Sequence, residues 1–230
     1  MERPQRRGLR RAPLGEGVRP EDRTRDGMTI TLYHCNQTRS MRPLWALEEM
    51  GLAYDLVTMP FPPRVFHKAY KEVNPLGTVP CLIDGDVKMT ESAGICQYLA
   101  DLYGPTPLGL TPKDADYGGY LNWLHRSDAT LTFPQTLVLR YTNLEPEERR
   151  SPQVAEDYRL WFLGRMRSVE EALADRIYLC ADRFTMADIC VGYAIHLALT
   201  IGIDEVLTPN TASYWRRLTE RPAYRRAKEL

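Results

Sequence analysis

The chain has 230 residues, of which 43% are hydrophobic, and its 30 basic and 30 acidic side chains give a formal net charge of zero. This composition is that of an ordinary globular protein, long enough for one large or two modest domains. A zero net charge gives no electrostatic footprint for nucleic acid, and the apolar runs are too short and too interrupted to span a bilayer. We therefore expect neither a nucleic-acid nor a membrane partner.

The first 27 residues differ from the rest, with eight Arg against five Asp and Glu and no apolar periodicity. Such a segment cannot build a core, so we expect a disordered extension over residues 1–27. A start codon assigned too early would explain it equally well. A targeting or nucleic-acid-binding arm is the other alternative, although the acidic residues count against a transit peptide.

Cysteine usage points to a reducing compartment. The five cysteines form an odd set with no close pair and no signal peptide before them: Cys35, Cys81, Cys96, Cys180 and Cys190. Disulfide frameworks in oxidising compartments usually show an even number of cysteines. We therefore expect free thiols and a cytoplasmic location.

The first half of the chain alternates strand and helix signals. Residues 29–33 alternate like a strand, and a helical spacing then leads to a stop at Gly51. Residues 53–59 predict a second strand. After it, residues 60–63 break the chain and residues 66–73 are weakly helical before a turn.

A hairpin and a helix complete this half. Asp84-Gly85 is a dipeptide typical of a two-residue type I′ turn, and it separates Leu82-Ile83 from Val87–Met89. From Glu91-Ser92 a helical pattern runs to Gly104.

The order β-α-β followed by β-β-α is that of a thioredoxin-like α/β domain, which we place at residues 28–105. A linker with Pro and Gly follows, and long helical patterns over residues 112–230 predict an all-α helical bundle domain. Its clearest signature is Thr185 with Asp188, a variant capping box in which Asp stands where Glu or Gln is usual.

Two elements of the first domain suit a ligand. Pro80 begins an apolar run, where a proline cannot donate to a ladder, so the backbone of Val79 is left for a ligand. Glu91 and Ser92 begin a helix, whose unsatisfied N–H groups and partial positive charge favour a carboxylate. Each element has a structural alternative, because Pro80 can simply begin a strand and Ser92 can simply cap a helix.

Four elements, taken in this order, resemble the cytosolic glutathione transferase family in its bacterial, theta-like form with hydroxyl activation. They are the strand, loop and helix from Leu32-Tyr33 to Gly51, the Val79-Pro80 pair, the Glu91-Ser92 pair and the capping box. The resemblance extends from Met28 to Leu230. It implies a glutathione site on the thioredoxin-like domain, a pocket between the domains for a small hydrophobic electrophile, and a homodimer.

Carried over by position, the resemblance assigns contacts with glutathione as a co-substrate, and no metal is expected. Pro80 would be cis, and Val79 would bind the cysteinyl amide through its backbone. Glu91 and Ser92 would hold the γ-glutamyl carboxylate and amine.

Catalysis requires activation of the thiol, because a thiol with a pKa of about 8.5 is mostly protonated at neutral pH and the thiolate is the nucleophile. A hydroxyl at the start of the first helix can hold the thiolate by a hydrogen bond. Related transferases place an activating serine four residues before an arginine that matches Arg42, and Thr38 occupies that place. Ser40 is the second candidate, with a plain N-cap as its alternative, and Cys35 is the third.

Cys35 also supports a rival function. Redox members of the thioredoxin superfamily use a cysteine in this loop to form a mixed disulfide with glutathione. The protein would then be a Cys35-dependent thiol reductase or dehalogenase. Against this, the cysteine of omega-like transferases lies nearer to Thr38, so Cys35 comes three residues early. A non-catalytic glutathione-binding module is a further alternative.

The remaining candidates are less specific. His67 and Lys68 lie in the region that binds the glycyl carboxylate, where a solvated face is the alternative. Trp123 and Ser127 lie four apart and share a helix face that could line the electrophile pocket, with ordinary helix packing as the alternative. The resemblance places Asp128 near the glutathione ammonium of a partner subunit.

The expected function is a detoxifying glutathione transferase that conjugates the thiolate to a small hydrophobic electrophile. The sequence does not identify that electrophile, because the helical-domain side chains that build its pocket follow no transferable pattern. Isomerase, dehalogenase and ether-cleaving activities stay open beside conjugation.

Overall fold

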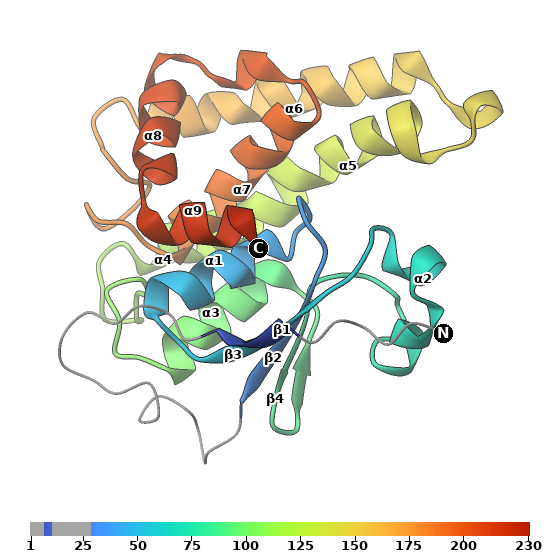
Figure 1. Cartoon of the computed structure of the whole chain (residues 1–230). Coiled ribbons are helices and arrows are strands. Elements are labelled where there is room, and N and C mark those ends of the chain that lie inside the picture. Colours follow the sequence, from blue (N-terminus) through green and yellow to red (C-terminus); the bar gives the residue numbers. More distant parts are fainter. Residues whose placement is uncertain (1–6, 11–28) are drawn as a thin grey trace. The chain divides into compact units, whose positions relative to one another are not determined.

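The computed structural model describes residues 7–10 and 29–230, and the chain divides into two compact units. The first unit holds the described residues up to Thr106 together with Arg221–Leu230, and the second holds Pro107–Glu220 (Figure 1). The helical domain was predicted over residues 112–230. Its last ten residues belong instead with the first unit, for a reason that the contacts of the C-terminal helix explain below.

The first unit is built on a five-stranded sheet of order β1-β3-β2-β4-β5. The strands are β1 (Arg7–Arg10), β2 (Ile30–His34), β3 (Tyr54–Thr58), β4 (Cys81–Asp84) and β5 (Val87–Met89). β2 and β3 are parallel, whereas β4 is antiparallel to both β2 and β5. This is the thioredoxin-like arrangement, so the predicted fold class is confirmed.

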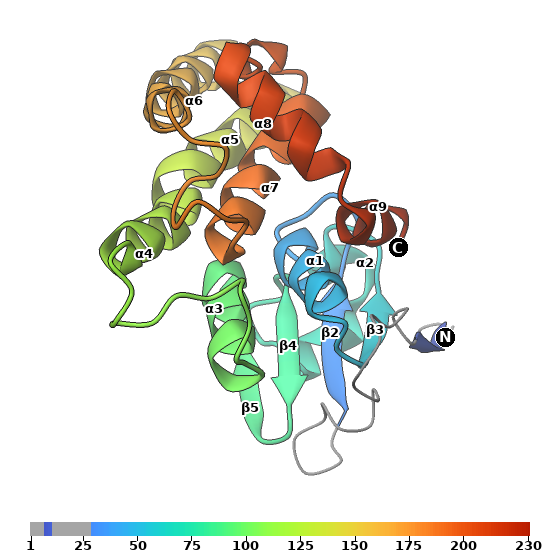
Figure 2. The same cartoon turned by 90° about the vertical axis from the view of Figure 1, so that its left-hand side faces the viewer.

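Helices cover both faces of this sheet. They are α1 (Met41–Met50), α2 (Pro63–Phe66) and α3 (Ser92–Leu102). α1 and α3 pack side by side on one face, and α2 lies on the other (Figures 1 and 2). Between α2 and β4, a 3₁₀ segment, η3 (Lys68–Glu72), takes the place of the weak helix predicted over residues 66–73.

The described part of the N-terminal extension is one short strand. Arg7–Arg10 pair as an antiparallel strand with β3. The open edge of β3 offers unpaired backbone groups to these four residues. The disordered extension over residues 1–27 otherwise stays a prediction. Residues 1–6 and 11–27 lie outside the described residues.

The turns of the first unit bear out one prediction and correct another. Gly51 ends α1 in the left-handed region at φ 63°, as predicted. The hairpin turn is formed by Gly85-Asp86 rather than Asp84-Gly85, and only Gly85 has a positive φ, so the type I′ prediction is wrong. Asp84 stays in β4 because its carboxylate accepts hydrogen bonds from Tyr98 at 2.8 Å and Tyr103 at 2.7 Å.

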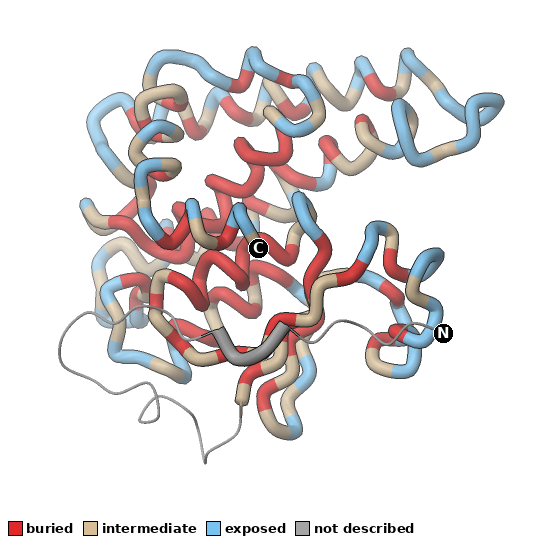
Figure 3. The backbone as a smooth tube through the Cα atoms, viewed as in Figure 1, coloured by how far each residue is buried: buried red, intermediate tan, exposed pale blue. Residues whose placement is uncertain are grey.

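The second unit is helical, as predicted. Its segments are α4 (Tyr117–Arg126), the π-helical η4 (Ser127–Thr132) and η5 (Arg140–Leu144), α5 (Phe133–Leu139), the 3₁₀ segments η6 (Glu147–Arg149) and η7 (Asp204–Val206), α6 (Pro152–Ala172), α7 (Met186–Thr200) and α8 (Pro209–Thr219). α7 is buried along most of its length and packs against α4, η4 and α8 (Figure 3). It begins with the predicted capping box of Thr185 and Asp188, which is confirmed.

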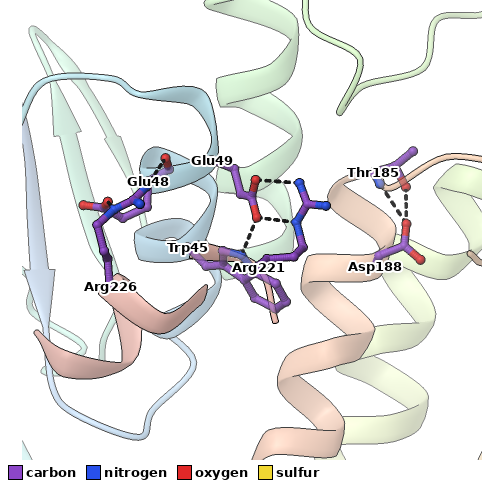
Figure 4. Close-up of polar contacts among 7 residues, drawn as sticks. All are labelled: Trp45, Glu48, Glu49, Thr185, Asp188, Arg221 and Arg226. Atoms are coloured by element: carbon purple, nitrogen blue, oxygen red, sulfur yellow. Dashed lines mark hydrogen bonds and ion pairs between the residues drawn. The ribbon is translucent and has the colours of Figure 1, made fainter. Parts of the chain in front are cut away.

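The C-terminal helix α9 (Pro222–Glu229) packs against α1. Arg221 forms a bidentate ion pair with Glu49, with N–O distances of 2.6 and 2.8 Å, and Arg226 pairs with Glu48 at 2.5 Å (Figure 4). The ring of Tyr224 also meets the edge of Trp45. These contacts explain why residues 221–230 belong to the first unit.

All five cysteines are free and buried, so the prediction of free thiols is confirmed.

Candidate functional site

The register of the sheet brings three loops to one edge. β2 is antiparallel to β4 with Tyr33 opposite Cys81, and β4 is antiparallel to β5 with Leu82 opposite Met89. The loop after β2, the residues before β4 and the residues after β5 therefore lie at the same edge (Figure 2). These three segments contain most of the candidates for glutathione binding: Thr38, Val79, Pro80, Glu91 and Ser92.

The loop between β2 and α1 carries a hydrogen-bonded pair of hydroxyls. The Thr38 hydroxyl donates to the Cys35 carbonyl at 2.8 Å and lies 2.8 Å from the Ser40 hydroxyl. Thr38 is half-buried, whereas Ser40 is fully buried. Ser40 occupies the N-cap position of α1, but its hydroxyl makes no capping bond and lies 2.8 Å from Nδ1 of His34 instead. The plain N-cap alternative is therefore right for the position of Ser40 and wrong for its side chain.

Cys35 lies in a small core with Met59, Tyr70 and Cys81. Its side chain is fully buried, and its Sγ faces the Pro60 carbonyl at 3.7 Å. Burial raises the pKa of the Cys35 thiol to about 12, because the thiolate would lose its hydration. A buried thiol that stays protonated is a poor nucleophile.

The Val79–Pro80 peptide bond is cis, as the resemblance implied. The preceding Thr78 carbonyl accepts hydrogen bonds from the Tyr70 hydroxyl at 2.7 Å and from the Asn74 side-chain amide at 2.9 Å. Within the described part of the chain, the Val79 amide and carbonyl have no hydrogen-bond partner. The segment is thus anchored on one side while the Val79 peptide groups stay open to a ligand.

Glu91 and Ser92 mark the start of α3. Glu91 is exposed and occupies the N-cap position without a side-chain capping bond. Ser92 is the first helical residue rather than the N-cap, and its hydroxyl accepts a hydrogen bond from Nη1 of Arg42 at 2.8 Å. Arg42 belongs to α1 and is fully buried. A guanidinium charge therefore adds to the positive end of the α3 dipole, an arrangement that favours a carboxylate.

His67 and Lys68 lie between α2 and β4. His67 is half-buried and Lys68 is exposed. The Tyr70 amide donates to the His67 carbonyl at 3.0 Å, and the Tyr70 hydroxyl anchors Thr78. The backbone of this segment is thereby tied to the Val79 loop, but neither side chain is hydrogen-bonded to that loop in the part of the chain that is described.

The remaining candidates lie in the second unit. Trp123 belongs to α4 and Ser127 begins η4. The fully buried Ser127 donates its hydroxyl proton to the Leu124 carbonyl at 2.6 Å, and the Arg126 guanidinium lies 5.1 Å from the centre of the Trp123 ring. Both contacts lie within the α4–η4 segment, so the electrophile pocket stays a prediction. Asp128 is half-buried in η4.

Neither a metal site nor a membrane-spanning helix is found in residues 7–10 and 29–230. No group of three or more His, Cys, Asp or Glu side chains there could hold a metal ion. No helix in those residues is long and apolar enough to cross a membrane.

Comparison with known proteins agrees with the class that the fold and site define, a thioredoxin-like unit joined to a helical unit. Residues 32–107 match the family model for the glutathione S-transferase N-terminal domain. Glutathione S-transferase F13 of Arabidopsis thaliana is 30% identical over 211 residues, which cover 86% of this chain and 94% of that protein. The chain therefore belongs to the glutathione S-transferase family.

Further relatives have the same extent. Glutathione S-transferase 3 of Schizosaccharomyces pombe is 27% identical over 210 residues, covering 87% of both chains. The crystal structure of glutathione transferase URE2P6 from Phanerochaete chrysosporium, in complex with oxidized glutathione, is 27% identical with a TM-score of 0.75. It covers 89% of this chain and 96% of its own.

Two residues of the site were not found from the sequence. Arg42 served only to locate Thr38, and His34 was not considered. Both are polar residues at buried positions, His34 on the buried face of β2 and Arg42 in the first turn of α1. A polar residue in a buried pattern needs a partner and is therefore a usable signal. The partner of Arg42 is 50 residues away, so identifying it required the fold.

Proposed function

We propose that in this glutathione transferase the Thr38 hydroxyl stabilises the thiolate of glutathione, which then attacks a small hydrophobic electrophile. The observation that carries the proposal is the difference in burial within the loop after β2. Thr38 is half-buried, whereas the two other candidates, Ser40 and Cys35, are both 0% exposed. A donor to a bound thiolate must reach the ligand, and Thr38 is the candidate that can.

The energetics are sufficient for activation without a general base. A hydrogen bond to a charged sulfur contributes about 1.5 to 3 kcal/mol, and the start of α1 adds about 0.3 to 1 kcal/mol. Together these lower the pKa of a thiol from about 8.5 by between one and nearly three. The thiol proton passes to solvent, the sulfur bonds to the electrophilic carbon, and in a substitution the leaving group departs with the electron pair.

The glutathione backbone would lie along the sheet edge. The open peptide groups of Val79, next to the cis Pro80, suit the cysteinyl amide. The exposed Glu91 suits the γ-glutamyl amine. The Ser92 side chain is 2% exposed and bonded to the buried Arg42, so Ser92 suits the γ-glutamyl carboxylate through its backbone N–H at the start of α3. His67 and Lys68 are proposed for the glycyl carboxylate from their position in the chain.

Other parts of the proposal rest on the family alone. Trp123 and Ser127 are proposed for the electrophile pocket, and Asp128 for contact with a partner subunit of a homodimer. A cytoplasmic location and a role in detoxification are inferred from the same relationship. Isomerase, dehalogenase and ether-cleaving reactions use the same activated thiolate and stay open.

The rival thiol reductase is disfavoured. A reductase would need a Cys35 thiolate in contact with the sulfur of glutathione, but the side chain is fully buried and its pKa is raised to about 12. Cys35 contributes to the small core behind the loop instead.

Variant kinetics with a model aryl halide separate these functions. We expect Thr38→Val, which keeps the side-chain shape but removes the hydroxyl, to lower kcat/KM by about 10- to 100-fold. We expect Cys35→Ser to retain most of the activity. Loss of turnover in Cys35→Ser with full turnover in Thr38→Val would reverse the assignment, and glutathione binding without turnover in wild type would indicate a binding module.

A further inference from the structure

A chain of hydrogen-bond contacts leads from His34 through Ser40 to Thr38, the proposed activator. His34 ends β2 and is 1% exposed, and its Nδ1 lies 2.8 Å from Oγ of the fully buried Ser40. Ser40 Oγ in turn lies 2.8 Å from Oγ1 of Thr38. This chain of contacts extends from the interior of the first unit to the half-buried Thr38 hydroxyl at the sheet edge.

The Cys35 backbone is enclosed by the same groups. Its carbonyl accepts the Thr38 hydroxyl at 2.8 Å and lies 3.2 Å from the Ser40 hydroxyl. Its amide donates to Ser40 Oγ at 3.2 Å. The buried Cys35 carbonyl therefore has two hydroxyl donors within reach, although each hydroxyl has only one proton to give.

This arrangement matters when Thr38 acts. If the single proton of Thr38 turns toward a bound thiolate, the Cys35 carbonyl loses its shorter donor, and a buried carbonyl without a partner is unfavourable. Ser40 can replace that donor from 3.2 Å. The Ser40 hydroxyl then donates its only proton to the Cys35 carbonyl. Nδ1 of His34 lies 2.8 Å from the same hydroxyl oxygen and must therefore donate to it.

The neutral imidazole of His34 can be this hydrogen-bond donor. Burial lowers the pKa of His34 to about 4, so one ring nitrogen carries a proton at neutral pH and the other does not. The Asn36 side chain and the Ser40 backbone act in the opposite direction and raise this pKa, but burial outweighs them. A proton on Nδ1 makes His34 a donor to Ser40.

We propose that His34 and Ser40 are positioning residues for the thiolate donor: the Nδ1–H of His34 holds Ser40, whose hydroxyl takes over the Cys35 carbonyl and releases the Thr38 proton to the glutathione thiolate. This inference rests on the proposed role of Thr38. Only hydrogen bonds are exchanged: the bond between the Ser40 and Thr38 hydroxyls is given up, Ser40 donates to the Cys35 carbonyl and Thr38 donates to the thiolate. Each hydroxyl keeps its own proton, and the thiol proton goes to solvent. Ser40 never touches the ligand.

The test is the pKa of the glutathione thiol bound to the whole chain, read from thiolate absorbance in the ultraviolet. We expect Ser40→Ala and His34→Leu each to raise this pKa by about 1. His34→Asn should stay near the wild-type value, because an amide N–H on a short side chain can reach about where Nδ1 lies. Affinity for S-methylglutathione, which has no ionisable thiol, should be unchanged.

Two controls exclude a purely structural effect. Ser168→Ala removes a similar hydroxyl-to-carbonyl bond of 2.8 Å on α6, and it should leave the thiol pKa unchanged. In a Thr38→Val background, Ser40→Ala and His34→Leu should add nothing, because residues that act through Thr38 have no route once its hydroxyl is gone. The His34 variants keep Ser40 Oγ, which accepts the hydrogen bond of the Cys35 amide. They therefore stay informative if Ser40→Ala folds poorly.

The outcomes separate this inference from the function on which it rests. If Thr38→Val raises the thiol pKa but Ser40→Ala and His34→Leu do not, the positioning role is wrong and Thr38 stands. If the Ser40 and His34 variants act equally with and without the Thr38 hydroxyl, the positioning role is again wrong. If Thr38→Val itself has no effect, both the activator and its positioning residues are overturned.

Discussion

Several side chains at the sheet edge are polar and buried, and they hold the surrounding site in place. Arg42 is 0% exposed and hydrogen-bonds to Ser92, and His34 is 1% exposed and lies behind Ser40. Such buried polar contacts are rigid, because breaking one leaves a polar group without water. At the residue scale, the geometry of the site is therefore set by groups that a ligand does not touch.

Arg42 gives the first prediction. Arg42→Met should weaken glutathione binding by about 10-fold, since the guanidinium both orients Ser92 and places positive charge below the start of α3. Arg42→Lys should retain part of the affinity, because an ammonium keeps the charge but not the planar geometry. Isothermal titration calorimetry measures both. An unchanged Kd in a folded Arg42→Met protein would contradict this role.

The cysteines give a second prediction. All five are buried, and burial raises the pKa of Cys35 to about 12 and that of Cys180 to about 11. The folded protein should react slowly with an aromatic disulfide reagent, whereas five thiols should react in denaturant. A single fast thiol in the folded protein that disappears in Cys35→Ser would count against Thr38 and in favour of the redox function.

At the scale of elements, the start of α7 is held by several hydrogen bonds to one carboxylate. The Asp188 carboxylate accepts hydrogen bonds from the Thr185 amide at 2.8 Å, the Thr185 hydroxyl at 3.0 Å, the Leu179 amide at 3.0 Å and the Tyr214 hydroxyl at 2.9 Å. Figure 4 shows the two bonds to Thr185 at the helix start. The bonds from Leu179 and Tyr214 join the same carboxylate to the preceding loop and to α8. Its role extends beyond the capping predicted from the sequence.

This carboxylate makes stability depend on pH. Burial raises the pKa of Asp188 to about 6 even though these hydrogen bonds favour the ionised form. The pKa in the unfolded chain is about 3.9, so between these values the folded state holds a proton that the unfolded state lacks. The resulting stabilisation is fully present below about pH 4 and is lost as the pH rises through about 6.

The variant Asp188→Asn tests the direction in which stability changes with pH. We expect the variant to be less stable than wild type by about 2 kcal/mol, because a neutral amide cannot accept all of these bonds. The difference in unfolding free energy should be about 1 kcal/mol larger at pH 5 than at pH 7, because wild type gains a proton that the variant cannot bind. Urea unfolding at both pH values measures it, and a larger difference at pH 7 would show that the hydrogen bonds outweigh burial.

Short signals in the sequence predicted elements better than they predicted contacts. Gly51 and the Thr185–Asp188 capping box depend on neighbouring residues, and both were predicted correctly. The hairpin turn was displaced by one residue because Asp84 is held by Tyr98 and Tyr103, which belong to α3 and its C-terminal end. Residues distant in the sequence therefore set the position of this turn, and no local pattern could reveal them.

At the scale of the whole molecule, the chain returns to its first unit at the C-terminus. Helical periodicity assigned α9 to the helical domain, but periodicity does not identify the partner of a helix. The pairing is made by Glu49 with Arg221 and Glu48 with Arg226, with Glu49 also accepting from Trp45 Nε1 at 2.9 Å (Figure 4). The partners are separated by more than 170 residues, which is why the sequence did not show them.

This pairing predicts that Arg221 stabilises the first unit. Arg221→Ala should lower its unfolding free energy by about 2 kcal/mol, because the largely buried Glu49 carboxylate loses a two-point partner. Urea unfolding followed by circular dichroism measures this change. Arg159→Ala is the matched control, because Arg159 is about as exposed as Arg221 but pairs with the exposed carboxylates of Glu156 and Glu205, and it should have a much smaller effect. Equal effects would mean that α9 does not depend on this ion pair.

The central claim is that Thr38 donates a hydrogen bond to the glutathione thiolate. The most direct measurement is the pKa of glutathione bound to the wild-type protein and to Thr38→Val, from thiolate absorbance as a function of pH. We predict a pKa well below the free value of about 8.5 in wild type and a return toward that value in Thr38→Val. A lowered pKa that persists unchanged in Thr38→Val would contradict the claim.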